Sequence, residues 1–190
     1  MKNIILIIFI GLMVSSCISI DPNSKNLSKN QLTFTENKSY IFSIVPSYSF
    51  KKDKSAIDVL ARFFYVYDKD GKYIRITPKF NSQVLIAENL NEKKQVISKQ
   101  ILNLLPYSKE NLDNGRESKT LYFNKKYEIL KKSSYSVADL GQSWSYYTSI
   151  IFLDKDGNLV ITQKNTEIAL IFLIPLGAKT VSSNIFNKVG

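Results

Sequence analysis

The chain has 190 residues, of which 44% are hydrophobic and 12% aromatic, and its formal net charge is +10. This apolar content is enough for a packed core and argues against a disordered chain, and the length suits one domain behind a targeting segment. The absence of histidine and the single cysteine, Cys17, exclude Ser-His-Asp hydrolases, Cys-His proteases, nearly all zinc enzymes and a disulfide framework.

The N-terminus has the layout of an export signal. Lys2 precedes an apolar stretch, Ile4 to Val14, and Ser15, Ser16 and Cys17 follow it. A helix that crosses a bilayer needs about 20 apolar residues, so this stretch is too short, whereas small residues before a cut are typical of a signal peptide. An ordinary cleaved signal and a buried N-terminal strand are the alternatives.

The segment Val14-Ser15-Ser16-Cys17 resembles the lipobox of bacterial lipoproteins. The resemblance implies that residues 1–16 are a signal peptide, that cleavage falls between Ser16 and Cys17, and that Cys17 is acylated, for example with palmitate. Two or more acyl chains hold a protein firmly on a membrane, at about 0.8 kcal/mol per buried CH₂. The residue after Cys17 is Ile18 and not Asp, which by analogy argues against retention in the inner membrane.

Residues 17–31 contain the lipidated cysteine and then mostly Asn, Ser and Lys, which predicts a flexible tether. A partly ordered arm is the alternative. Residues 32–190 are expected to form a single β-rich globular domain.

The first half of this domain shows mostly strand periodicity. Alternating apolar residues predict four strands, and Pro46, which interrupts the first, suits an edge strand or a bulge. Between the second and third strands, Asp68-Lys69-Asp70-Gly71 predicts a type I turn followed by a left-handed residue. The predicted strands are Tyr40–Phe50, Ile57–Tyr67, Lys72–Thr77 and Val84–Ala87.

The next segment, Asn89 to Leu105, has a helical period. Ile97, Ile101 and Leu104 fall on one face of a helix, and Glu92 stands where a capping box places its acid, three residues after Asn89. Pro106 would end this helix.

The second half returns to strands. A hairpin is predicted at Trp144–Leu153 and Asn158–Gln163, and an uninterrupted apolar strand, Ile168–Ile174, is predicted to be buried on both faces and ended by Pro175 and Gly177. The fold class is therefore mainly β (α+β), with about eight antiparallel strands in a sandwich or barrel and one amphipathic helix. The remaining predicted segments are the strands Thr120–Leu130 and Thr180–Phe186 and the loops Tyr107–Ser118 and Lys131–Gln142.

The turn Asp-Lys-Asp-Gly occurs twice, at residues 68–71 and 154–157. An internal duplication and a pair of calcium loops are the functional interpretations. The glycine is the fourth residue of the motif and not the sixth, which does not suit an EF-hand-like calcium loop. The preference of these residues for turns is enough to explain why the motif occurs twice.

No residue set predicts catalysis. Ser49-Phe50-Lys51-Lys52 matches the Ser-x-x-Lys pattern of acyl enzymes but lacks its companion motifs. The isolated glycines form no phosphate-binding loop, and the acids are expected mainly in turns and on the predicted helix. We therefore expect no enzyme activity, no cofactor and no metal, although carboxylates that meet only in space are not visible in a sequence.

Aromatic residues are densest in the segment that contains Tyr135, Trp144, Tyr146 and Tyr147. Exposed residues of these types anchor protein partners or stack on sugars, so they are candidate partner-binding residues; burial in the core is the alternative. The lysine pairs are scattered and arginines are few, which argues against nucleic acid and favours a protein or anionic polysaccharide partner.

The lipobox, the polar tether and the basic β-rich domain without further cysteine are similar to small outer-surface lipoproteins of spirochaetes. This resemblance implies an outer-membrane lipoprotein, surface-exposed or facing the periplasm, that acts as an antigen or contacts host molecules. A carrier of an apolar ligand in a β-barrel and an accessory subunit of an envelope assembly complex are the alternatives. The oligomeric state is left open.

Overall fold

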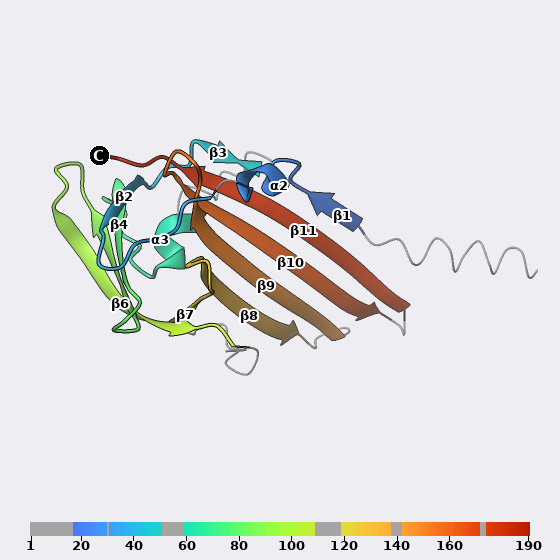
Figure 1. Cartoon of the computed structure of the whole chain (residues 1–190). Helices are drawn as coiled ribbons and strands as arrows, with labels where there is room; N and C mark the ends of the chain where they lie inside the picture. Colours follow the sequence, from blue (N-terminus) through green and yellow to red (C-terminus); the bar gives the residue numbers. More distant parts are fainter. Residues whose placement is uncertain (1–16, 30, 51–58, 109–118, 138–141, 172–173) are drawn as a thin grey trace, which may run out of the picture.

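The structure, a computed structural model, describes residues 17–29, 31–50, 59–108, 119–137, 142–171 and 174–190 (Figure 1). These residues form eleven strands and two short helices. The strands are β1 (Cys17–Ile20), β2 (Tyr40–Ser43), β3 (Tyr48–Ser49), β4 (Tyr73–Lys79), β5 (Val84–Leu90), β6 (Val96–Pro106), β7 (Thr120–Phe123), β8 (Ile129–Val137), β9 (Gln142–Leu153), β10 (Leu159–Ile171) and β11 (Ile174–Phe186), and the helices are α2 (Ser24–Leu27) and α3 (Val59–Phe63).

All strands belong to one mixed sheet in the order β1-β11-β10-β9-β8-β7-β6-β5-β4-β2, and β3 also pairs with β11. The β6–β7 and β1–β11 pairs are parallel and the others antiparallel. The prediction of a mainly β protein is confirmed, but the predicted sandwich or barrel of about eight antiparallel strands is wrong. The sheet curls until β2 meets the chain after β11, where Ser43 N–H donates to the Asn187 carbonyl and Val189 N–H to that of Ile41. Because this contact is confined to one end of β11, the sheet stays open.

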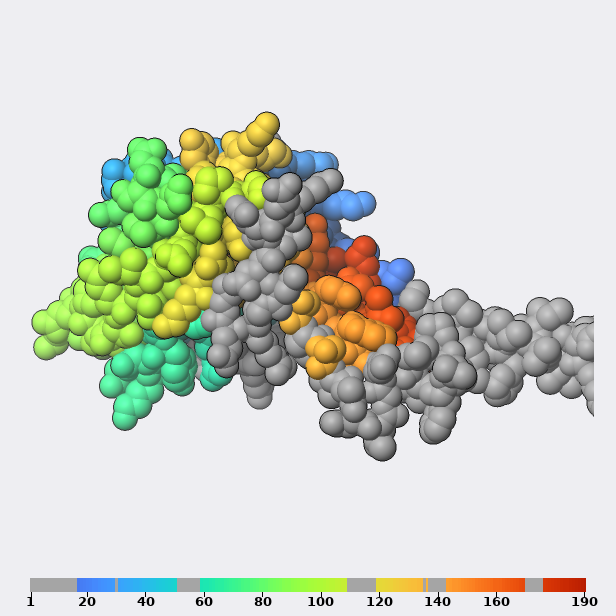
Figure 2. Space-filling model, turned by 90° about the horizontal axis from the view of Figure 1, so that it is seen from below, coloured from blue at the N-terminus to red at the C-terminus, as the bar shows by residue number. Residues whose placement is uncertain are grey.

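The core lies in the bend of the sheet, around α3 (Figure 1). Leu60 and Phe64 are fully buried there and share a core cluster with Ile151 and Phe186 from the far half of the sheet. In the space-filling view, the green strands β4–β6 and the orange and red strands β9–β11 occupy opposite ends of the molecule (Figure 2).

The predicted strand Ile57–Tyr67 is wrong for its described residues, which form α3 and the turn after it. Both sides of this segment are apolar and buried, so strand and helix periods could not be separated. The helix is short because Tyr65 adopts a left-handed conformation, with φ 57°, after which the chain turns away.

The predicted helix Asn89–Leu105 is also wrong: the segment forms the end of β5, a turn and β6. Leu102 and Leu104 are fully buried at strand spacing, whereas Ile101, expected on the buried helix face, is 58% exposed. The turn is made by Asn91, whose side-chain oxygen accepts the Gln95 N–H at 3.0 Å. Pairing with β5 along the sheet outweighs the local helical pattern.

The other predicted strands are confirmed in part. The strands at 72–77, 84–87 and 180–186, the break at Pro46 and the hairpin of β9 and β10 are all present. The predicted strand at 120–130 is divided between β7 and β8. The predicted loop at 131–142 is wrong, because most of it belongs to β8 and β9. Residues 138–141 of that loop and residues 109–118 of the other predicted loop lie outside the described part.

The apolar run Ile168–Ile174 is not a strand buried on both faces, since Ile168 is 42% exposed. It contributes to the ends of β10 and β11, which pair Ile171 with Ile174. Pro175 and Gly177 lie inside β11 and do not end a strand. They are tolerated because they lie near the start of β11, where β10 is the paired strand and β1 pairs only from Ala178 on.

Candidate functional site

Cys17, the predicted lipidation residue, is exposed and is the first residue of β1. It lies opposite Ala178 in the parallel β1–β11 pair, at the outer edge of the sheet (Figure 1). The thiol is therefore accessible from solvent. Ser16, on the other side of the predicted cleavage point, lies outside the described residues.

The N-terminal arm, residues 17–32, is fastened to β11 through Asp21. Asp21 is fully buried, and its backbone N–H donates to the Val181 carbonyl at 2.8 Å. One carboxylate oxygen accepts the Tyr48 hydroxyl at 3.0 Å and the Asn23 backbone N–H at 2.9 Å. The carboxylate thus joins the two short strands, β1 and β3, that share one edge of β11.

Burial raises the pKa of the Tyr48 hydroxyl above its ordinary value of 10.0; the hydrogen bond from Asn23 opposes this shift, and the nearby Asp21 carboxylate adds to it. The proton that Tyr48 donates to Asp21 is therefore held more tightly in the folded protein than in the unfolded chain. A raised pKa of this kind contributes stability below pH 10, and the contribution is lost as the pH rises through the folded value.

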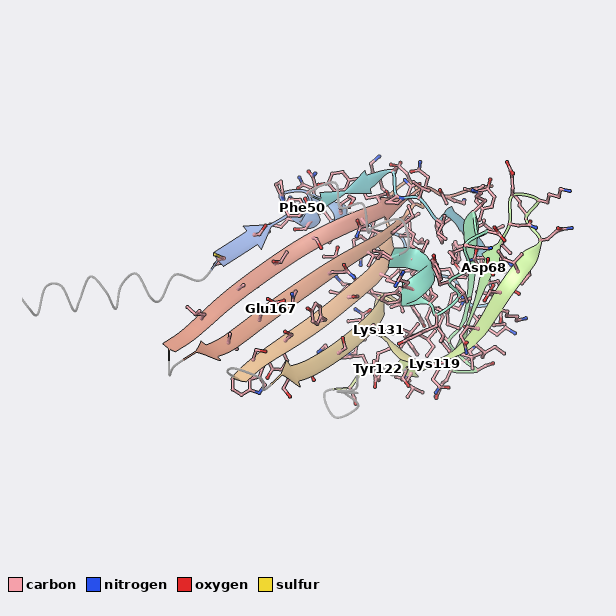
Figure 3. All side chains as sticks on the ribbon, turned by 180° about the vertical axis from the view of Figure 1, so that it is seen from behind. Phe50, Asp68, Lys119, Tyr122, Lys131 and Glu167 are labelled. Carbon is pink, nitrogen blue, oxygen red and sulfur yellow. The ribbon has the colours of Figure 1, made fainter. Side chains whose placement is uncertain are left out.

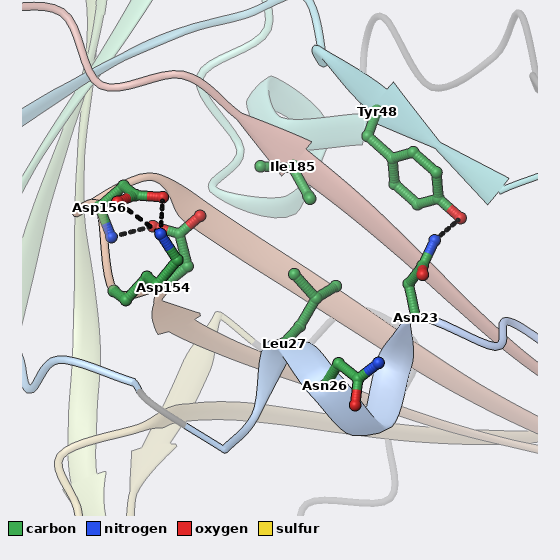
Figure 4. A pocket seen from close by; sticks show the side chains of 8 residues that line it. Asn23, Asn26, Leu27, Tyr48, Asp154, Asp156 and Ile185 are labelled. Carbon is green, nitrogen blue, oxygen red and sulfur yellow. Dashed lines mark hydrogen bonds and ion pairs between the residues drawn. The ribbon is translucent and has the colours of Figure 1, made fainter.

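The rest of the arm also lies on the sheet, where a flexible tether was predicted. Leu32 N–H donates to the Leu153 carbonyl at 2.9 Å, and the Gln31 side chain donates to Glu128 at 2.5 Å. A surface pocket of about 380 Å³ lies between α2, β3 and the β9–β10 turn, with Leu27 and Tyr48 in its wall (Figure 4). The polar composition of the arm suggests a tether. The three residues that fasten the arm to the sheet, Asp21, Gln31 and Leu32, are spaced irregularly, so they give no periodic signal in the sequence.

The sheet of β9–β11 has two distinct sides. Ile151 and Ile161 pair with each other and are fully buried in the cluster around α3, which defines the helix face. Phe152 and Val160 pair on the other side and are also buried. We call that side the arm face, because the groove above it is lined jointly by α2 and by Phe152.

The four candidate partner-binding aromatics do not form one cluster. Trp144 and Tyr146 lie two residues apart on β9, on the arm face; Trp144 is half-buried and Tyr146 is 51% exposed. Tyr147 is on the helix face, half-buried, with its hydroxyl 3.4 Å from Glu167 on β10 (Figure 3). Tyr135 lies opposite Ser145, and its side chain is outside the described part. These residues lie toward one end of the sheet, but strand alternation separates them.

A second groove, of about 340 Å³, runs along the arm face beside β1. Three lysines line it: Lys25 from α2, Lys164 from β10 and Lys179 from β11. Its walls also carry Ile20 and the hydroxyl of Thr162. The sequence showed these lysines only as scattered charges, because they come together through strand pairing.

On the helix face, Lys131 has a structural role. Its ammonium donates to the Tyr65 hydroxyl at 2.5 Å and lies 4.1 Å from the centre of that ring, beside α3 (Figure 3). This contact ties β8 to the turn after α3.

The carboxylates of the repeated turn are also structural. Asp154 accepts the backbone N–H groups of Asp156 and Asn158, and Asp68 accepts that of Asp70. Within the described ranges, no three His, Cys, Asp or Glu side chains gather as a metal site. Ser49 pairs with Asn184 at the edge of β11, and Lys51 and Lys52 of the Ser-x-x-Lys pattern fall outside the described residues.

The chain matches no family model, no curated protein and no solved structure. Among the described residues, no helix has the length and apolar character needed to cross a membrane.

Proposed function

We propose that the protein is a lipid-anchored lipoprotein of the cell envelope that binds a macromolecular partner without catalysis. Residues 1–16 are the signal peptide, Cys17 carries the lipid, and the β-rich domain is displayed at the outer membrane. The observation that carries the proposal is the lipobox-like segment Val14–Cys17 after a short apolar stretch, in a chain whose single cysteine is exposed at the free edge of the sheet.

The partner is a protein or polysaccharide with negative charge. The formal net charge of +10 favours such a partner because a basic surface attracts anions before contact. Tyr147 is the aromatic candidate on the helix face, Trp144 and Tyr146 are those on the arm face, and Tyr135 is the fourth candidate.

The alternative of a barrel-shaped carrier receives less support. A carrier of this type encloses its ligand in a closed barrel, whereas this sheet is open and its bend is filled by the core around α3. The accessory-subunit alternative stays a prediction.

Metabolic labelling with palmitate in the native bacterium tests the anchor. The wild-type chain should incorporate label and fractionate with membranes, and Cys17→Ala should lose the label because no other thiol can take its place. Ser19→Ala, two residues away on β1, is the matched control and should label like wild type. Equal labelling of Cys17→Ala and wild type would contradict the proposal.

Protease treatment of intact cells separates the two orientations. Digestion of the anchored domain without lysis indicates surface display, and digestion only after the outer membrane is opened indicates a domain that faces the periplasm. Binding of the purified lipoprotein to immobilised heparin, with neutral dextran as the control, tests the anionic partner. Equal retention on both matrices would rule out charge as the basis of recognition.

A further inference from the structure

Exposed apolar side chains gather on the arm face, close to Cys17. Ile18 and Ile20 of β1 are 63% and 50% exposed, Tyr146 of β9 is 51% exposed and Ile168 of β10 is 42% exposed. Strand register places all four on the same side, since Ile18 pairs beside Lys179 and Ile168 lies opposite Trp144. Scattered exposed apolar residues are ordinary, but a group on one face indicates contact with another phase or molecule.

The same face has a surplus of positive charge. Lys25, Lys164 and Lys179 line one groove, and none of them forms an ion pair with another described residue. Glu128 is the one carboxylate among the described residues that line this groove, so three lysines face one negative charge, and its two oxygens already accept bonds from Gln31 and Asn124. The groove therefore suits an anionic group such as a phosphate.

We infer that the arm face is a peripheral membrane surface that lies on an anionic lipid bilayer, with lipid phosphates in the Lys25–Lys164–Lys179 groove. The inference rests on the proposed function, since the acylated Cys17 would hold this edge of the sheet at the membrane. Trp and Tyr favour the boundary between headgroups and acyl chains, lysines pair with anionic headgroups, and isoleucines enter the outer acyl region.

The arm gives the anchor little freedom. Asp21 is buried and bonded to β11, so the lipidated cysteine is only four positions from this fixed point, a reach of about 14 Å when fully extended. Cys17 also begins β1, whose register with β11 is regular from its first residue. A domain attached this closely must rest one of its surfaces on the bilayer, and the exposed isoleucines and the lysine groove favour the arm face.

A bilayer explains the face better than the other occupants. An anionic polysaccharide would match the lysines but would leave the isoleucines in water, and a second copy would bring like charges together. A zwitterionic bilayer would match the apolar residues but not the groove.

Trp144 provides a direct test because it is the only tryptophan in the chain and lies on the arm face. The purified lipoprotein is reconstituted in vesicles of phosphatidylcholine with phosphatidylglycerol that contain lipids brominated near the headgroup end of the acyl chains. Trp144 fluorescence should shift to shorter wavelength and fall by about half, and salt at about 0.5 M should reverse much of the effect.

The variant Lys25→Gln/Lys164→Gln/Lys179→Gln should lose most of this quenching, because each lysine near an anionic surface contributes about a factor of five to association. The matched control Lys69→Gln/Lys93→Gln/Lys94→Gln removes three exposed lysines elsewhere and should behave like wild type. Circular dichroism of each variant checks that the sheet is retained.

The outcomes separate the surface from the anchor. If mass spectrometry finds the lipid and the protein floats with the vesicles, but Trp144 is not quenched, the membrane surface is overturned and the lipoprotein proposal stands. If no lipid is found but Trp144 is still quenched by the anionic vesicles and not in the triple variant, the surface is supported and the anchor fails. Equal quenching in pure phosphatidylcholine, or a response of Trp144 to heparin and not to vesicles, would overturn the assignment to anionic lipid.

Discussion

Two buried carboxylates, Asp21 and Glu88, hold different parts of the sheet together. Asp21 fastens the arm to β11, as described above. Glu88 on β5 accepts from Arg75 on β4 at 2.6 Å and lies 3.5 Å from Lys99 on β6, so it links three adjacent strands. Glu88 faces a cation with each of its two oxygens, which accounts for its burial. Asp21 accepts its two hydrogen bonds with Oδ1, and its buried Oδ2 has no partner among the described residues.

Replacement of Asp21 by alanine should loosen the arm. The Tyr48 hydroxyl and the Asn23 N–H would lose their acceptor, which lowers the free energy of unfolding by about 1–3 kcal/mol. Urea denaturation measures the loss, and hydrogen exchange should show faster exchange in residues 17–29. Asp70→Ala, at an exposed turn acid, is the control; an arm that stays equally protected in both variants would contradict the role of Asp21.

Glu88 should make stability depend on pH in the acid range. Burial alone would raise the pKa of Glu88, but the hydrogen bond and charge of Arg75, with the charge of Lys99, hold it below its ordinary value of 4.5. A lowered pKa contributes stability that is present above pH 4.5 and is lost as the pH falls through the folded value.

Glu88→Gln should therefore unfold about 1–2 kcal/mol more easily than wild type at pH 7, and the difference should shrink below pH 4.5. Denaturant titrations across this pH range provide the measurement. Glu92→Gln, in the exposed β5–β6 turn, should show no such difference. A gap between Glu88→Gln and wild type that is unchanged at low pH would argue against an ionic contribution.

At the scale of elements, turn chemistry was predicted better than strand or helix type. Both Asp-Lys-Asp-Gly segments form turns as expected, because the first aspartate accepts the N–H two residues on and fixes the turn locally. Only the turn at 154–157 joins two strands, β9 and β10, whereas the turn at 68–71 leads from the segment after α3 into β4. The glycines, however, are needed for different reasons. Gly157 has a left-handed φ of 81°, whereas Gly71 leaves space for the buried Asn89 amide.

This difference predicts opposite tolerance to asparagine. Gly157→Asn should cost less than about 1 kcal/mol, because asparagine accepts left-handed geometry. Gly71→Asn should lower the free energy of unfolding by about 2 kcal/mol or more, because the new Cβ would lie 2.7 Å from the amide carbon of Asn89. The amide nitrogen of Asn89 donates to the Val66 carbonyl, so this side chain is not free to move. Thermal unfolding of the two variants compares them directly, and equal losses would show that the turns are equivalent.

The errors at α3 and β6 share a physical origin. Each segment has apolar residues that satisfy two periods, and long-range pairing decided between them: α3 fills the bend of the sheet, while β6 extends it. For the candidate site, Cys17 and the aromatic segment were visible as local patterns. The lysine groove was not, since Lys25, Lys164 and Lys179 come from distant parts of the chain.

At the scale of the whole molecule, hydrogen bonds hold Cys17 and the arm on the sheet. The arm runs from exposed Cys17 through buried Asp21 to Leu32, and it makes hydrogen bonds to β3, β9, β11 and the β7–β8 turn. Lipid attached to Cys17 would thus hold the long strands β8–β11 near the membrane and direct the β4–β6 half away from it. That far half, with its exposed turn lysines, is then available to an anionic partner.

Mass spectrometry of the N-terminal peptide from the native protein tests the central claim most directly. The account predicts a peptide that begins at Cys17 and carries the added mass of a diacylglycerol and a further fatty acid. A peptide that retains residues 1–16, or one that begins elsewhere with an unmodified Cys17, would contradict it.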